Sequence, residues 1–212
     1  QWKGATSNNK AEWRSTYGES PEYVLFGDWQ VCFQTYADLY KLDPDTIKIA
    51  RAREVMEYQM STSKLDYWHW VDALYMVMPV MVKMYDITKN PLYLEKLHQY
   101  LTVTDSIMYD REVGLYYRDA KYPYPFHKTI NGKKDFWSRG DGWAFAAFAK
   151  VLKQLPAEDK YREEYITRFQ TMAKSIAACQ QPEGYWTRSL IDPEQAPGPE
   201  TSGTALFTYG FL

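Results

Sequence analysis

Residues 68–108, WHWVDALYMVMPVMVKMYDITKNPLYLEKLHQYLTVTDSIM, contain the pattern that decides the fold. Apolar side chains recur at helical spacing over residues 68–85 and again over residues 92–108. Between the two runs stands Lys89-Asn90-Pro91, and proline is common at the first position of a helix. A connection this short predicts an antiparallel hairpin of two helices.

The same organisation extends along the rest of the chain. Short acidic turns that contain proline also stand at residues 43–45 and 156–159. The sequence therefore predicts an all-α protein built from helix pairs. Apolar spacing places its helices at residues 28–41, 46–60, 68–85, 92–108, 142–155, 161–180 and 201–212.

A longer repeat joins these helix pairs. The sequence GLYYR at residues 114–118 recurs in variant form as GYWTR at residues 184–188. Each copy follows a helix, reads as a short extended piece, and leads through a polar loop to a helix start that contains glycine, at residues 138–145 and 200–207. Repetition of helix pair, short strand and loop predicts a closed toroid or an open solenoid.

Composition excludes several classes of protein. The net charge of −2 and the pI near 6.0 argue against a nucleic-acid partner. No apolar run approaches the roughly 18 residues that a membrane span requires, so no membrane partner is expected. Aromatic residues make up 17% of the chain, which suits either an aromatic-rich core or a sugar-binding cleft. Cys32 and Cys179 fall in apolar helical patterns and are predicted to be free, buried thiols.

Asp72 is the first candidate for chemistry, because it stands in an aromatic and nearly uncharged stretch. At helical spacing its neighbours would include Trp68, His69 and Tyr75. Burial disfavours the ionised carboxylate and should raise its pKa, whereas a protonated His69 would oppose that shift. A carboxyl group that exchanges a proton near neutral pH suits acid/base chemistry on a sugar. The alternative is a buried structural aspartate.

Two further sites combine charge with a helix start. Asp28 stands at the entry of the first predicted helix, where it could cap the helix or grip sugar hydroxyl groups. Arg139 lies between Ser138 and Gly140 at another helix start and could hold a carboxylate by two parallel hydrogen bonds. Trp143 could stack on a sugar face. The alternative is a tight turn with a surface arginine.

The sequence favours no metal or other cofactor. His69, His98 and His127 lack the spacing of metal ligands, and the two cysteines are isolated. The chain also contains no phosphate-binding loop and no nucleophile elbow.

Several motifs together resemble glycoside hydrolase family 105, the unsaturated rhamnogalacturonyl hydrolases. The order and spacing agree from about Asp28 to Leu212. The resemblance implies a six-hairpin (α/α)6 toroid, with residues 1–212 as a single domain that lacks N-terminal and C-terminal helices of the family. The matching segments are residues 34–40, 70–76, 136–143, 189–193 and 200–207.

The resemblance also implies an activity. The family removes a 4,5-unsaturated uronic acid from oligosaccharides made by polysaccharide lyases, and it does so by adding a proton at C4 and water at C5. Asp72 matches the proton donor and base of that reaction, and no cofactor is needed. The expected partner is the unsaturated oligosaccharide, and a homo-oligomer is compatible with the sequence. Matching substrate-binding positions are Asp28, His69, Trp70, Arg118, Arg139, Trp143, Thr201 and Ser202.

Some residues depart from the family pattern. Asp141 stands where asparagine is common, and its charge would repel an anionic substrate unless it is paired. The segment around Asp28, Trp29 and Phe33 also differs from that of many members. A non-catalytic carbohydrate-binding or scaffold toroid is therefore the main alternative. A sugar epimerase is weaker, because it would need pairs of histidines as acid and base.

Overall fold

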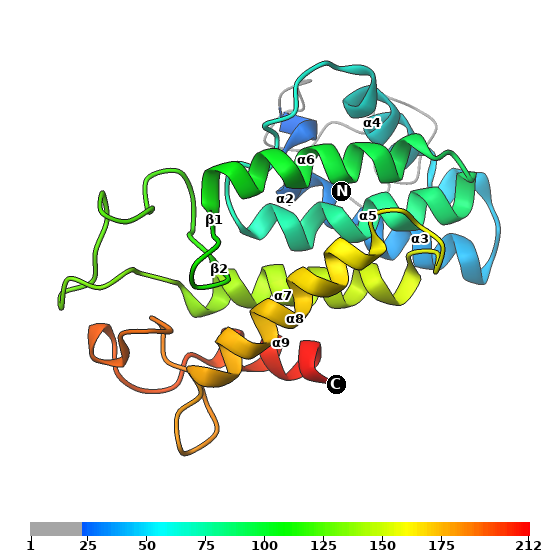
Figure 1. Cartoon of the computed structure of the whole chain (residues 1–212). Helices are drawn as coiled ribbons and strands as arrows, with labels where there is room; N and C mark the ends of the chain where they lie inside the picture. Colours follow the sequence, from blue (N-terminus) through cyan, green and yellow to red (C-terminus); the bar gives the residue numbers. More distant parts are fainter. Residues whose placement is uncertain (1–22) are drawn as a thin grey trace.

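The computed structural model describes residues 23–212, and this part of the chain is mostly helical (Figure 1). One two-stranded antiparallel sheet pairs β1 (Tyr109–Asp110) with β2 (Leu115–Tyr116). Residues 23–212 also contain the short 3-10 helices η2 (Tyr23–Leu25), η3 (Thr46–Lys48) and η4 (Pro193–Gln195). The α-helices are α2 (Gly27–Gln30), α3 (Phe33–Leu42), α4 (Ala50–Ser61), α5 (Asp72–Thr88), α6 (Leu92–Met108), α7 (Ser138–Gln154), α8 (Arg162–Ala178) and α9 (Thr201–Phe211).

The helices form two layers. In the first layer α3 packs against α5, α5 against α7, and α7 against α9. In the second layer α4 contacts α6, while α6 and α8 also cover α5 and α7 respectively (Figure 1). Each first-layer helix from α5 onward thus alternates with a second-layer helix along the chain. This arrangement confirms the predicted organisation in helix pairs.

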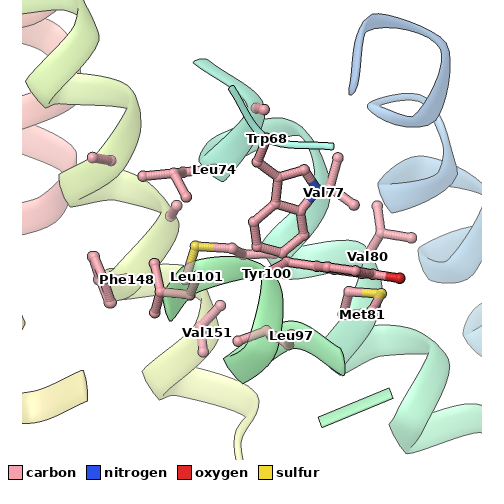
Figure 2. Packing of buried hydrophobic residues seen from close by; sticks show 14 of the residues in the cluster. Trp68, Leu74, Val77, Val80, Met81, Leu97, Tyr100, Leu101, Phe148 and Val151 are labelled. Atoms are coloured by element: carbon pink, nitrogen blue, oxygen red, sulfur yellow. The ribbon is translucent and has the colours of Figure 1, made fainter. Parts of the chain in front are cut away.

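The core lies between the layers and is centred on α5. All of its residues from Val77 to Met84 are buried, and its apolar side chains share one core cluster with Trp68, Leu97, Tyr100, Phe148 and Val151 (Figure 2). Burying such side chains contributes on the order of 2 kcal/mol each. Much of the aromatic content therefore serves the core.

Pro79 lies inside α5 and interrupts its ladder of hydrogen bonds. Because proline has no N–H group, it cannot donate to the carbonyl group of Tyr75, four residues earlier. The side chain of Gln34 replaces that donor, with its Nε2 atom 2.8 Å from the Tyr75 oxygen. Lys150 of α7 in turn donates to Oε1 of Gln34 at 2.8 Å. Gln34 thus connects α3, α5 and α7 at the helix defect.

A buried ion pair fastens the second layer to the sheet. Arg168 of α8 contacts Asp105 of α6 at 2.7 Å, and both side chains are almost fully buried. The hydroxyl group of Tyr116 donates to Asp105 at 2.6 Å, and Arg168 also lies 2.7 Å from that hydroxyl oxygen. Because each charged group has its partner, the cluster fixes how α6, α8 and β2 meet.

Most predicted helices are confirmed within a few residues, although the helix expected over residues 142–155 begins earlier, at Ser138. Two further predictions are wrong. The helix expected over residues 28–41 is broken at Val31 and Cys32 into α2 and α3. The helix expected from residue 68 begins only at Asp72, because Trp70 pairs with the loop at Asp119 instead. Within residues 23–212 no helix is both long enough and apolar enough to cross a membrane.

Candidate active site

The helices α5, α7 and α9 begin at the same end of the first layer (Figure 1). Asp72, Ser138 and Thr201 are their first residues. The loops that precede α7 and α9 lie at that end as well (Figure 1). The layered fold therefore gathers most of the predicted site residues at one end of the molecule.

The repeat seen in the sequence has a structural counterpart at this end. The carbonyl group of Arg118 accepts from the backbone N–H of Val71 at 2.9 Å, and that of Arg188 accepts from Ser138 at 2.8 Å. Each extended piece of the repeat thus pairs with the residue just before, or at, the start of a first-layer helix. Arg118 and Arg188 therefore hold equivalent places beside α5 and α7. The neighbouring residues form two matching bridges, Trp70 with Asp119 and Trp137 with Ser189.

Asp72 is half-buried at the start of α5. Burial is the main cause that raises the pKa of its carboxyl group, and the nearby charge of Asp28 adds to the rise. A hydrogen bond from its own backbone and the charges of Arg118 and Arg139 lower the pKa, but they do not offset burial. The result is a carboxyl group that holds its proton to higher pH than usual, within the electrostatic influence of two arginines.

Arg139 is an exposed side chain held at the start of α7. Its guanidinium group lies 4.2 Å from the ring centre of Trp137 and 3.6 Å from Oε1 of Glu200. Stacking on an indole ring leaves the edge of the guanidinium group available to a planar anion. Neither Trp137 nor Glu200 was identified from the sequence as a candidate site residue.

The glycines beside Arg139 allow close packing of α7. A Cβ atom on Gly140 would lie 2.8 Å from Val71 and 2.9 Å from the Trp137 ring. A Cβ atom on Gly142 would lie 2.9 Å from Leu206 of α9. The absence of side chains therefore lets α7 approach its neighbours closely.

Trp143 is half-buried one turn further along α7. Its ring centre lies 4.6 Å from that of Tyr75, and Nζ of Lys150 lies 4.4 Å from the Tyr75 ring centre. The same Lys150 donates to Gln34, so it connects the Pro79 defect to Tyr75, the ring that packs against Trp143.

The residues around Asp28 form a small aromatic group. Phe26 is exposed, and its ring contacts those of His69 at 5.8 Å and Trp70 at 5.4 Å. Asp28 is exposed, and Phe26 occupies the cap position of α2 without a side-chain hydrogen bond. The expectation that Asp28 caps a helix is therefore wrong. Asp28 is close enough to Asp72 to act on its charge, and because it is exposed it is available to a ligand.

Thr201 and Ser202 begin α9, and Glu200 caps that helix by accepting from the backbone N–H of Gly203. The hydroxyl group of Ser202 donates to Oε1 of Glu200 at 2.5 Å, whereas Thr201 is exposed. Glu200 thus links the start of α9 to Arg139.

Asp141 does not face this site. It is fully buried, and its Oδ1 atom accepts from the backbone N–H of Tyr116 at 2.8 Å. Burial raises its pKa well above the usual value, although the Tyr116 hydrogen bond opposes the rise. The expected repulsion of an anionic substrate therefore does not arise, because the carboxyl group lies inside the protein.

A second group of polar residues at this end was not predicted. Buried Asp135 contacts Nε2 of His127 at 2.9 Å and Nη1 of Arg188 at 2.5 Å. Although burial alone would raise the pKa of Asp135, these two contacts hold it below the usual value. The only sequence signal for this group is the equivalence of Arg118 and Arg188 in the repeat. Throughout the part that the structure describes, no three His, Cys, Asp or Glu residues are placed to hold a metal ion.

Comparison with known proteins gives matches of two kinds. The sequence model of Glycosyl Hydrolase Family 88 matches residues 5–212. An unsaturated 3S-rhamnoglycuronyl hydrolase of Alteromonas sp. (strain LOR) is 36% identical over 143 residues, which cover 68% of this chain and 34% of that protein. The chain thus spans about a third of the length of this curated relative.

Solved structures give the second kind of match. A protein described as a polysaccharide lyase is 75% identical with a TM-score of 0.90, and the match covers 99% of this chain and 59% of that one. A family 105 glycoside hydrolase of C. acetobutylicum ATCC 824 is 20% identical with a TM-score of 0.74, over 91% of this chain and 58% of that one. The second match is a likeness of fold, and it confirms the predicted α/α-toroid class.

Proposed function

Since this chain belongs to Glycosyl Hydrolase Family 88, we propose that the protein removes a 4,5-unsaturated uronic acid from the end of an oligosaccharide. The observation that carries the proposal is Asp72, a half-buried carboxyl group with a raised pKa that lies near Arg118 and Arg139. The substrate is an acidic sugar, so it needs cationic groups for its carboxylate and a proton donor for its double bond.

The reaction assigns one role to each group. Asp72 gives its proton to C4, and the positive charge that develops at C5 is shared with the ring oxygen. Water then adds at C5 and returns a proton to Asp72. The hemiketal opens by breaking the bond from C5 to the ring oxygen, and C1 then releases the remaining sugar as an alcohol. Asp72 thus acts first as acid and then as base.

Arg139 and Arg118 suit the binding of the uronic carboxylate. A planar guanidinium group binds a carboxylate through two parallel hydrogen bonds. Arg139 is held in place by Trp137 and Glu200, so less conformational entropy is lost when a ligand binds. Trp143 and Trp70, both half-buried, could offer a ring face to the sugar.

The test replaces Asp72 with asparagine, which keeps the shape of the side chain but removes the transferable proton. Turnover of unsaturated disaccharides should fall at least about a hundredfold, since acid/base groups commonly contribute that much. Asp86→Asn is a matched control, because Asp86 lies at the other end of α5 in a surface ion pair with Lys41. Turnover by Asp72→Asn at more than about one percent of the unaltered rate would overturn the assignment.

A second candidate function is favoured by the match to a protein described as a polysaccharide lyase. A lyase takes the proton from C5 of a saturated uronic acid and breaks the bond from C4 to the departing oxygen, which creates the double bond. The same arginines would then stabilise the carboxylate while C5 loses its proton.

The dependence of the rate on pH separates the two candidates. If Asp72 acts as an acid, the rate falls as pH rises through its raised pKa, because the carboxyl group loses its proton. If Asp72 acts as the base of an elimination, the rate rises over the same range. A non-catalytic sugar-binding toroid would bind these saccharides without turnover of either kind.

A further inference from the structure

The His127–Asp135–Arg188 group has the features of a binding site that the proposed reaction does not use. Asp135 is 1% exposed, whereas the side chains of His127 and Arg188 are 36% and 32% exposed. A buried carboxylate thus orients two side chains that both reach the surface. Such orientation is what a second sugar-binding position requires, because it reduces the entropy lost on binding.

A chain of contacts connects this group to the candidate active site. The ring of His127 lies 4.4 Å from that of Tyr122, and the guanidinium group of Arg118 lies 5.5 Å from the Tyr122 ring centre. Arg118 acts on the charge of Asp72. On the other side, the carbonyl group of Arg188 accepts from Ser138, the residue before Arg139.

The equivalence of the repeats gives a second, independent argument. Arg118 pairs with the chain just before Asp72, and Arg188 pairs with the chain just before Arg139. Since Arg118 stands close enough to α5 to act on Asp72, Arg188 holds the corresponding place beside α7. The two arginines therefore flank the starts of adjacent first-layer helices.

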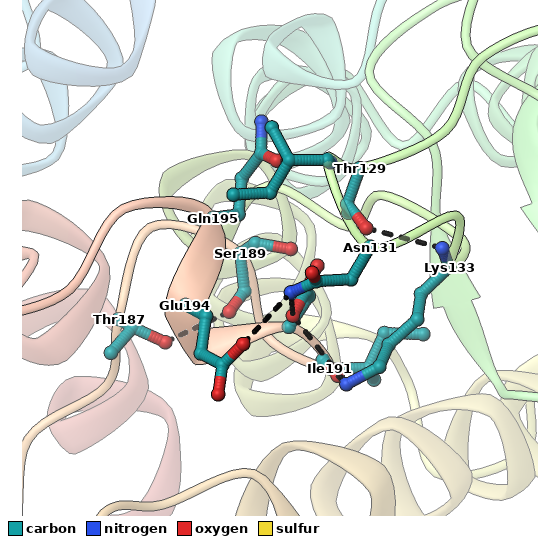
Figure 3. Close-up of polar contacts among 10 residues, drawn as sticks. Thr129, Asn131, Lys133, Thr187, Ser189, Ile191, Glu194 and Gln195 are labelled. Atoms are coloured by element: carbon teal, nitrogen blue, oxygen red, sulfur yellow. Dashed lines mark hydrogen bonds and ion pairs between the residues drawn. The ribbon is translucent and has the colours of Figure 1, made fainter.

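The loop that carries His127 is fixed at its tip. Asn131 donates to Glu194 at 3.1 Å (Figure 3) and to Asp192 at 2.9 Å. Gln195 accepts from the backbone N–H of Ile130 at 2.7 Å. These bonds tie the loop to the segment that follows Arg188. Two sets of contacts therefore restrain His127. Its ring contacts Asp135, and the hydrogen bonds of Ile130 and Asn131 hold its loop in place.

We propose that His127 and Arg188 form a sugar-binding subsite beside Asp72, which takes the hydroxyl groups of the neutral sugar linked to the uronic acid. The proposal rests on the proposed function only for the identity of the uronic acid. With Nε2 donating to Asp135, Nδ1 of His127 accepts from a sugar hydroxyl group. The guanidinium N–H groups of Arg188 that Asp135 does not use donate to a neighbouring oxygen.

The pairing of Arg188 with Asp135 indicates that the bound sugar is neutral. Asp135 offsets the charge of Arg188, so this ion pair has no net charge. A sulfate or carboxylate on the bound sugar would need a cation that is not already paired. The subsite therefore discriminates against a sulfated sugar.

The kinetic test compares two substrates that share the unsaturated uronic acid. One carries a neutral sugar at C1 and the other carries a methyl group. His127→Ala and Arg188→Ala should each raise KM for the disaccharide about tenfold, as expected for the loss of one or two hydrogen bonds, and leave the methyl glycoside unchanged. His98→Ala is the matched control, because His98 stacks on Tyr161 between α6 and the start of α8. Equal losses for both substrates would indicate a structural role and overturn the proposal.

A binding test keeps the proposal falsifiable if the His127→Ala and Arg188→Ala proteins fail to fold or no turnover is found. Asp72→Asn protein with labelled histidines is titrated with saturated and unsaturated uronyl disaccharides, and the imidazole resonances are followed by NMR. The resonance of His127 should shift with a neutral second sugar and less with a sulfated one. Absence of turnover with a His127 shift would reject the proposed function and keep the subsite. No shift, or a larger shift with the sulfated sugar, would overturn the subsite.

Discussion

Replacing Gln34 with leucine should destabilise the protein, chiefly because the Tyr75 carbonyl group loses its donor. Gln34 replaces the backbone donor that Tyr75 lacks because of Pro79, and leucine preserves the volume but not the hydrogen bond. A buried carbonyl group without a donor costs about 1–3 kcal/mol. Lys150 also loses its contact with Gln34, so the upper half of that range is expected.

A double-mutant cycle tests whether this loss of stability arises from the Tyr75 carbonyl group. Pro79→Ala returns an N–H group to the position four residues after Tyr75, so the helix can satisfy that carbonyl group itself. Gln34→Leu should then cost about 1 kcal/mol less in the Pro79→Ala background than alone. The free energy of unfolding is measured by denaturant titration followed by tryptophan fluorescence.

A matched control is a second buried glutamine. Gln30 is buried and donates to the carbonyl group of Val24, and this hydrogen bond does not depend on Pro79. Gln30→Leu should therefore have the same cost with and without Pro79→Ala. If Gln34→Leu and Pro79→Ala are additive within about 0.5 kcal/mol, the coupling between Gln34 and the helix defect is refuted.

Three further predictions concern charged groups. Arg139→Ala should raise KM for unsaturated disaccharides more than it lowers kcat, and an unchanged KM would argue against its binding a carboxylate. Asp141 has a raised pKa when folded, so its contribution to stability is full below about pH 3.9 and is lost as pH rises through the raised value. Asp141→Asn should remove that dependence and leave the protein at least as stable at neutral pH, and a large loss in thermal unfolding would contradict this. Arg168→Met should cost about 3–5 kcal/mol in denaturant titrations because it leaves Asp105 buried and unpaired, and a loss below about 1 kcal/mol, as expected for an exposed pair, would contradict the buried ion pair.

The sequence predicts a helix best where no distant segment of the chain competes for its residues. The bounds of α6 match the prediction because Pro91 and an uninterrupted apolar pattern define the helix. The prediction for α5 begins too early, since residues 68–71 have the same apolar spacing but pair with the loop at Arg118 and Asp119. Helix spacing cannot reveal a competing partner almost fifty residues further along the chain.

The site is predictable only in part, for the same reason. Asp72, Arg139 and Trp143 stand out because local sequence and helix starts mark them. His127 and Arg188 do not, because they meet through Asp135 across a loop and no local pattern contains all of them. The direction in which Asp141 points depends on the rotation of α7, and that rotation is set by packing against neighbouring helices.

The most direct measurement is the ultraviolet absorbance of the conjugated double bond during incubation with the protein. Lyase-generated unsaturated oligosaccharides and saturated acidic polysaccharides are supplied separately, to the unaltered protein and to Asp72→Asn. The proposed function predicts that absorbance falls with the unsaturated substrate, stays constant with the saturated one, and does not change with Asp72→Asn. A rise in absorbance from the saturated polysaccharide would contradict the account and identify a lyase.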